Sequence, residues 1–151
     1  QPCSSAASDV YKRQVLTHAH EDHIGAIAHV WPDLKCKIYA TPFTAVLITE
    51  KFKEKKIDIT QHLKIVQLNG KIKLGPFDIE FVTLTHSILE PNGLSIKTPA
   101  GIILHTGDWK IDPNPLIGDK INEKKLKELG QNKVLAMICD STNIFNPGRA
   151  G

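Results

Sequence analysis

The segment LTHAHEDHIGAI, from Leu16 to Ile27, decides how this chain is interpreted. It places three histidines and two acidic residues within six positions, between an apolar start and a small, apolar end. Val15 to Thr17 is expected to end a buried strand, so the titratable residues would fall in the loop that follows. Imidazole nitrogens and carboxylate oxygens are the donors that zinc takes at about 2.0–2.2 Å. The segment therefore predicts a metal site.

The spacing inside this segment predicts two ions. Residues two apart in an extended loop point the same way, so His18 and His20 can bind one ion. Asp22 and His23 would then turn toward a second ion, and a carboxylate such as Asp108 can bridge the two. Metals about 3.5–4 Å apart can hold a hydroxide and contact both the attacking and the leaving oxygen. Bound zinc lowers the pKa of water to about 7, so this chemistry requires no dedicated side-chain base.

Composition is that of a soluble globular domain. The chain has 151 residues, of which 41% are hydrophobic and 23% charged. The net charge of +3 permits an anionic partner such as RNA without requiring one. The three cysteines form no CxxC pair, which argues against a disulfide scaffold or a cysteine zinc site and favours a reducing compartment. No apolar stretch is long enough to span a membrane.

The two ends differ from the rest of the chain. Residues 1–14 are polar and patternless, and SAASDVYKRQ within them resembles read-through of sequencing-adapter DNA, so we expect a non-native leader there. This segment lacks the apolar core of a signal peptide. Residues 141–151 end in the loop-like NIFNPGRAG and are expected to lead into a further domain. Residues 15–140 are then expected to form a partial domain.

Short apolar segments alternate with helical patterns. We expect helices at 24–30, 42–56 and 122–129, and strands at 37–40, 64–68, 71–74, 77–84, 94–98, 101–106 and 134–139. Asn69-Gly70 predicts a hairpin between two of these strands. The last strand should be fully buried, and Gly130 should cap the helix before it. The helix at 42–56 should turn inward Phe43, Val46, Leu47 and Phe52. This order favours an α/β protein whose largely antiparallel sheet is covered by helices.

Further candidate ligands also follow predicted strands. His86 comes after the strand at 77–84, Asp108 after the strand at 101–106, and Asp140 after the strand at 134–139. Loops at one edge of a sheet are where functional sites are usually assembled. We therefore expect these residues to join the histidine cluster at one edge.

Several motifs together resemble a known superfamily. HAHEDH, THS at His86 and HTGDWKIDP around Asp108 are similar to the metallo-β-lactamase superfamily. The spacings of 68 residues from His18 to His86 and 22 from His86 to Asp108 fit its RNA-processing β-CASP branch. HTGDWKIDP and CDSTNIFNPGRAG resemble the ribonuclease J family. The resemblance covers residues 15–151 and implies a metallo-β-lactamase fold, an αββα sandwich that is incomplete at both ends, with residues 141–151 leading into a β-CASP domain.

The resemblance also implies a site and an activity. The family binds two Zn²⁺ ions, with Mn²⁺ as an alternative, and its ligands fall by motif on His18, His20, Asp22, His23, His86 and Asp108. The first ion would be bound by His18, His20 and His86, and Asp108 would bridge. Asp22 and Asp108 are the implied catalytic residues, and Asp22 would orient the zinc-bound hydroxide or accept its proton. The family hydrolyses RNA phosphodiesters as a 5′→3′ exonuclease and endonuclease in RNA maturation and decay, acts in the cytoplasm, and commonly forms homo-oligomers.

The sequence also departs from the family. It has THSILEP where the family has THSIPE or THSIPD, and a further histidine of the second zinc site would lie beyond the β-CASP domain. Other interpretations are a hydrolase of a small thioester or lactone, a non-catalytic scaffold, and a truncated reading frame that is poorly soluble and inactive alone. Six further residues are weaker candidates, for which the sequence allows either a structural role or a contact to RNA or to the metal ligands. They are Ser87, His105, Lys110, Asp140, Trp31 and Trp109.

Overall fold

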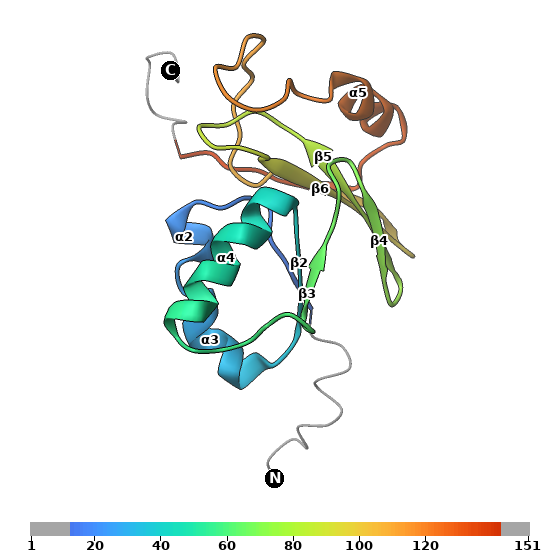
Figure 1. Ribbon diagram of the computed structural model, residues 1–151. Coiled ribbons are helices and arrows are strands. Elements are labelled where there is room, and N and C mark those ends of the chain that lie inside the picture. The colour runs from blue at the N-terminus through green and yellow to red at the C-terminus, as the bar shows by residue number, and fades with distance from the viewer. Residues whose placement is uncertain (1–12, 143–151) are drawn as a thin grey trace.

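The computed structural model describes residues 13–142, which form two β-sheets placed face to face with helices on both outer sides (Figure 1). The first sheet contains β1 (Arg13–Val15), β2 (Lys37–Ala40) and β3 (Leu63–Ile65). The second sheet contains β4 (Lys71–Leu74), β5 (Phe77–Thr83), β6 (Asn92–Thr98), β7 (Gly101–His105) and β8 (Ala136–Ile138). The helices are α2 (Glu21–Ile24), α3 (Ile27–Leu34), α4 (Pro42–Glu54) and α5 (Glu123–Gln131). Residues 1–12 of the predicted leader and residues 143–151 lie outside the described part.

The first sheet is parallel throughout, in the order β1-β2-β3. Parallel neighbours need a crossover connection, which α2 and α3 provide between β1 and β2, and α4 between β2 and β3. These helices share one core with the sheet, in which Ile38, Ile48 and Phe52 are fully buried. The Trp31 indole meets the Phe52 ring edge-on, with ring centroids 5.7 Å apart, and donates its N–H to the Cys36 carbonyl oxygen. Trp31 is therefore a core residue.

Helix α4 confirms most of the predicted inner face, because Phe52 is fully buried and Phe43 and Leu47 pack against the core. Pro42 begins the helix, where its missing N–H is tolerated. The buried stripe runs through Ala45, Ile48 and Phe52, at the three- and four-residue spacing of one helix face. Val46 lies two positions from Ile48, on the opposite side, and is 61% exposed. The prediction for Val46 was wrong because the apolar residues of this helix occupy more than one face.

No helix within residues 13–142 has both the length and the apolarity to cross a membrane.

The second sheet packs between the first sheet and α5. Its order is β4-β5-β6-β7-β8, antiparallel from β4 to β7 and parallel between β7 and β8. Alternate residues of a strand face opposite sides. Ile79 and Phe81 of β5 belong to the core that faces the first sheet, whereas Val82 and the following Leu84 pack toward α5. This produces the layers helix, sheet, sheet, helix, and the predicted α/β sandwich is confirmed.

The chain passes between the sheets at Asn69-Gly70, and the predicted hairpin there is wrong. β3 and β4, which flank this dipeptide, belong to different sheets. Asn69 has a left-handed φ of 56°, and its side-chain oxygen accepts from the Thr83 N–H at 3.1 Å and the Asn122 amide at 2.9 Å. A Cβ at Gly70 would lie 2.6 Å from the Gln67 carbonyl oxygen. The two residues form a turn anchored by distant partners, and the true hairpin joins β4 to β5 at Gly75-Pro76.

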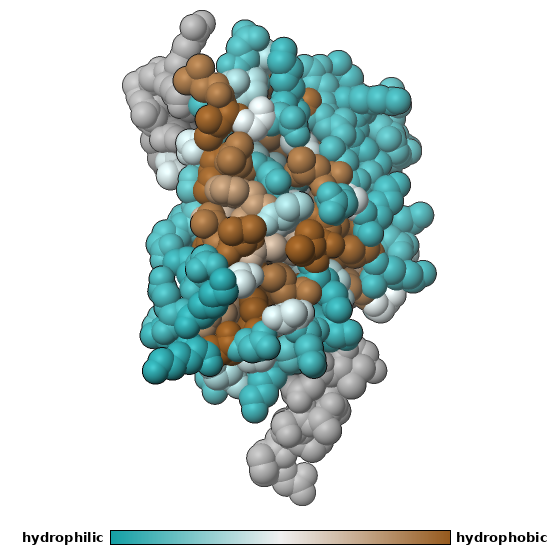
Figure 2. Space-filling view, viewed as in Figure 1, coloured by the Kyte–Doolittle hydropathy of each residue, from teal (hydrophilic) through white to brown (hydrophobic). Residues whose placement is uncertain are grey.

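The last strand is shorter and more exposed than predicted. β8 stands at the end of the sheet order beside β7, and all three of its residues are exposed. Met137 is 50% and Ile138 55% exposed. Figure 2 shows hydrophobic residues gathered in the middle of one face of the molecule, with hydrophilic residues on both sides. Strand burial depends on what covers the sheet, and an apolar run alone does not show it.

Helix α5 also differs from the prediction, because it continues through Gly130 to Gln131.

The inner face of α4 can be tested by paired substitutions. Phe52→Ala removes a fully buried ring and should lower the free energy of unfolding by about 3–5 kcal/mol. Val46→Ala removes an exposed side chain and should change it by less than about 0.5 kcal/mol. Urea unfolding followed by circular dichroism measures both. Equal losses in the two variants would show that the helix faces are assigned incorrectly.

Candidate metal centre

The predicted ligands come together at one edge of the two sheets. β5, β7 and β8 run in the same direction, so the segments that follow them leave the second sheet at the same edge. His86 lies after β5 and Asp108 after β7. His18 follows β1 of the first sheet, and the carbonyl oxygen of Thr17 beside it accepts the Asn92 backbone N–H at 3.1 Å. The two sheets are therefore hydrogen-bonded to each other directly beside the site.

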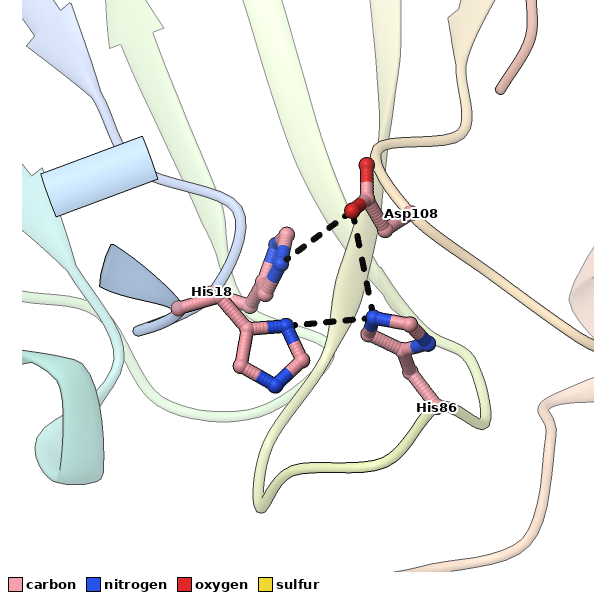
Figure 3. Close-up of side chains that lie close together, drawn as sticks. His18, His86 and Asp108 are labelled. Atoms are coloured by element: carbon pink, nitrogen blue, oxygen red, sulfur yellow. Dashed lines mark hydrogen bonds and ion pairs between the residues drawn. The ribbon is translucent and has the colours of Figure 1, made fainter. Parts of the chain in front are cut away.

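A first group of donors consists of three histidines and one aspartate. Donor atoms of His18, His20, His86 and Asp108 all lie within 4.8 Å of one another. His20 Nδ1 and His86 Nε2 are 3.1 Å apart. The carboxylate Oδ2 of Asp108 is 3.9 Å from both His18 Nε2 and His86 Nε2. Figure 3 shows the side chains of His18, His86 and Asp108 pointing toward one another.

A second group shares Asp108 with the first. Donor atoms of Asp22, His23 and Asp108 also lie within 4.8 Å of one another. His23 Nε2 is 3.2 Å from Asp108 Oδ2 and 3.6 Å from Asp22 Oδ2. Asp22 and His23 belong to the one-turn helix α2 and not to an extended loop, because the His20 carbonyl oxygen accepts the His23 and Ile24 N–H groups. The structure thus brings all six predicted ligands together in two groups joined by one carboxylate.

The surroundings of His18 and His86 disfavour the charged form of their imidazoles. His18 is completely buried, and its ring centroid lies 4.1 Å from that of His23 and 5.0 Å from that of His20. Burial, followed by repulsion from the His23 imidazole, lowers the pKa of His18 to about 4, although the Asp108 carboxylate acts in the opposite direction. Burial and the neighbouring His20 also lower the pKa of His86. At neutral pH these two rings are uncharged and can offer lone pairs.

The arrangement fits a bound cation. Within residues 13–142, His18 Nε2 is a buried nitrogen without a hydrogen-bond partner. Its other ring nitrogen, Nδ1, lies 3.0 Å from the Thr17 hydroxyl oxygen. A buried polar atom without a partner is unfavourable unless something else satisfies it. A hydrogen bond at one ring nitrogen commonly orients the other toward a metal, and His18 Nε2 faces Asp108. Imidazole and carboxylate donors are those that zinc prefers.

The turn before Asp108 is shaped by close packing. Gly107 has φ of 60°, and a Cβ there would lie 3.1 Å from both the Asn92 carbonyl oxygen and the Thr17 Cβ. The Gly107 N–H donates to His105 Nδ1 at 3.0 Å. His105 therefore stabilises this turn, which is one of the two roles considered for it. Glycine is required here both by the backbone conformation and by the lack of space.

The weaker candidates surround the site without joining the donor groups. Lys110 pairs with Asp112, with Nζ 3.5 Å from Oδ2. Asp140 accepts from the Thr142 hydroxyl and N–H, and the Thr142 hydroxyl is the main reason that the pKa of Asp140 is lowered. The Trp109 indole nitrogen lies 3.3 Å from the Cys139 sulfur. Each of these side chains thus has a structural partner.

Sequence reasoning missed the threonines next to the ligands. Thr17, Thr85 and Thr106 are buried, and they precede His18, His86 and the Gly107-Asp108 pair. Their hydroxyls contact His18, Lys110 and Gly107 respectively. The repeated occurrence of threonine just before a ligand, in THAH, THS and TGD, was a usable signal.

The lowered pKa of His18 predicts how stability depends on pH. In the unfolded chain His18 takes up a proton near pH 6.5, whereas in the folded, metal-free chain it does so only near pH 4. The free energy of unfolding should therefore fall as pH decreases from 6.5 to 4, at about 1.4 kcal/mol per unit of pKa difference. Urea unfolding in the presence of a chelator measures this. His18→Gln should flatten the dependence, and His29→Gln, at an exposed position, should not. An unchanged slope in His18→Gln would contradict the assignment.

Comparisons with known proteins identify the family of the chain. A family model described as the Beta-lactamase superfamily domain matches residues 1–126. Ribonuclease J from Sinorhizobium meliloti is 42% identical over 139 residues, covering 91% of this chain and 24% of that protein. Ribonuclease J from Corynebacterium glutamicum is 43% identical over 143 residues, covering 91% of this chain and 19% of that protein. The chain thus spans a quarter or less of the length of these relatives.

A solved structure supports the fold independently. A protein of unknown function from Enterococcus faecalis V583 superposes with a TM-score of 0.63 at 21% identity, over 93% of this chain and 34% of its own. At this identity the similarity concerns the fold alone. Members of the superfamily bind divalent metals, for which the histidine and aspartate cluster is suited. The chain therefore belongs to the beta-lactamase superfamily, and over most of its length it is similar to ribonuclease J.

Proposed function

We propose that this chain carries the metal centre of a ribonuclease of the ribonuclease J type, which hydrolyses RNA phosphodiesters. The observation that carries the proposal is the pair of donor groups that share Asp108, in a chain 42% identical to a ribonuclease J over 91% of its length. The proposal covers 5′→3′ exonuclease and endonuclease activity in RNA maturation and decay. It also includes action in the cytoplasm, assembly into a homo-oligomer, and a β-CASP domain that begins after residues 141–151.

The proposed site holds two ions, Zn²⁺ or alternatively Mn²⁺. His18, His20 and His86 would hold one ion, Asp22 and His23 the other, and Asp108 would contact both. When bound, such ions supply Lewis acidity, which makes water more acidic and balances negative charge on a phosphodiester. The buried, uncharged His18 is prepared for this role, because no proton has to leave its ring at neutral pH.

The aspartates of the site would have separate tasks. Asp108 is 29% exposed in its side chain and lies between His18, His23 and His86, so its main task is to hold the two groups of donors together. The Asp22 side chain is 75% exposed, and its Oδ2 contacts only the edge of the cluster, 3.6 Å from His23 Nε2. A carboxylate placed in this way can orient a water molecule and accept its proton. In-line attack of that water on the phosphorus would leave a 5′-phosphate and a 3′-hydroxyl.

The net charge of the chain and one lysine support an RNA substrate. The chain carries a net charge of +3, and Lys110 lies on the segment that follows Asp108. Burial and His20 are the main causes of the lowered pKa of His86, and the Lys110 ammonium contributes in the same direction. Its side chain is 28% exposed. A lysine in this position can attract a phosphate to the site as a point charge.

The complete protein that contains this chain should degrade RNA only with its metal site intact. With 5′-monophosphorylated RNA and added Zn²⁺ or Mn²⁺, we expect mononucleotide release by the wild type. Asp108→Ala should lower the rate by more than about 100-fold, because loss of an outer partner alone commonly costs 10–100-fold. Asp33→Ala, at an exposed position in α3, should leave the rate unchanged. Nucleotides are quantified by chromatography and bound metal by mass spectrometry.

Two results would separate the parts of this proposal. Intact RNA together with hydrolysis of a small thioester or lactone would keep the metal centre and overturn the ribonuclease. Absence of bound metal in the wild-type protein would overturn both. Full RNA hydrolysis by the Asp108→Ala protein would show that Asp108 is not the shared carboxylate of the site.

A further inference from the structure

Thr85 connects the two ligand segments of the second sheet. It lies just after β5, between the buried Leu84 and the ligand His86, and is 2% exposed. Its carbonyl oxygen accepts the Lys110 N–H at 2.8 Å, and the two residues form an antiparallel bridge outside the main sheets. The segment that carries His86 is therefore paired directly with the segment that follows Asp108.

The Thr85 hydroxyl reinforces this pairing. It donates to the Lys110 carbonyl oxygen at 2.5 Å and accepts the Asp112 N–H at 3.2 Å. A hydroxyl has one hydrogen to donate and lone pairs to accept with, and here both functions are used on one segment. Thr85 thus bonds the N–H and the carbonyl of Lys110 together with the N–H of Asp112.

These bonds act close to the ligands. His86 is the next residue after Thr85, and Asp108 is two residues before Lys110. Without the bonds to Thr85, the backbone between Asp108 and Asp112 would be held only at its start, by the turn at Gly107. With Thr85 in place, the segment is fixed at both ends, and His86 Nε2 lies 3.9 Å from Asp108 Oδ2. The hydroxyl has no place in the donor groups, so its role is separate from metal ligation.

We propose that Thr85 is a positioning residue whose hydroxyl sets the distance between His86 and Asp108 and thereby the metal affinity of the site. The inference rests on the metal centre proposed above. Outer hydrogen-bond partners of metal sites typically contribute 10–100-fold to affinity. Their contribution depends on the geometry they impose, so removal of the hydroxyl should change the coordination as well as the affinity.

Thr83 provides a matched control for the substitution. It lies two residues before Thr85 at the end of β5 and is 3% exposed. Among residues 13–142, no hydrogen-bond partner is present for its hydroxyl oxygen. Thr83→Val and Thr85→Val therefore make the same chemical change at two equally buried sites of one segment, and only the second removes hydrogen bonds.

The affinity test compares Thr85→Val, Thr85→Ser and Thr83→Val with the wild-type chain. Zn²⁺ affinity is measured by competition with a chromophoric chelator, and coordination by the visible absorption of the Co²⁺-substituted protein. Thr85→Val should bind Zn²⁺ about 10- to 100-fold more weakly and show an altered Co²⁺ spectrum. Thr85→Ser, which keeps the hydroxyl, should restore both, and Thr83→Val should match the wild type. Wild-type affinity and spectrum in Thr85→Val, or an equal loss in Thr85→Ser, would overturn the proposal.

A second measurement needs neither metal nor a stable variant. In the metal-free wild type, the Asp112 amide should be protected from hydrogen exchange at least about tenfold, because it donates to Thr85. An unprotected Asp112 amide would overturn the positioning role even if Thr85→Val failed to fold. A protected amide in a wild-type chain that binds neither Zn²⁺ nor Co²⁺ would mean that the proposed metal centre has failed, and with it the effect of Thr85 on affinity.

Discussion

The carboxylate of Asp108 is the point on which the site depends. One oxygen of this group lies 3.2 Å from His23 Nε2 and 3.9 Å from both His18 Nε2 and His86 Nε2. Two of the imidazoles around it, His18 and His86, have a lowered pKa because of burial and neighbouring rings, and they are uncharged at neutral pH. His18 Nε2 is also buried without a hydrogen-bond partner in the described part of the chain, which is unfavourable, so the rest of the fold has to hold the arrangement.

The fold holds these side chains from two directions. His18 comes from the first sheet, whose helices share a well-buried core, and His86 and Asp108 come from the second sheet. Between the sheets, Thr17 bonds to Asn92 through both the backbone N–H and the side-chain amide of Asn92. Such bonds to backbone groups are short-range and directional. They fix relative positions that packing of apolar side chains alone would leave free to slide.

Much of the site was predictable because its chemistry is local in sequence. HAHEDH contains four of the six donors, and strand ends carry His86 and Asp108. The errors concern features that depend on distant residues. Asn69-Gly70 has the residue types that favour a hairpin turn. Thr83 and Asn122, however, donate hydrogen bonds to the Asn69 side chain, and the chain passes into the other sheet. The apolar strand β8 has the composition of a buried strand, yet its exposure is set by what lies beside it. For Thr85 the sequence offers only its place before a ligand, because its partners Lys110 and Asp112 follow it by more than twenty positions.

The division of donors between the sheets links metal binding to folding. His18, His20, Asp22 and His23 all follow β1, whereas His86 and Asp108 follow strands of the second sheet. An ion that contacts His18 and His86 together would therefore connect the two sheets across their shared core. Binding to the folded state alone stabilises it by mass action. Without an ion, His18 Nε2 is buried and has no hydrogen-bond partner in the described part of the chain, which is unfavourable for folding. An ion at this edge would thus complete both donor groups and stabilise the contact between the sheets.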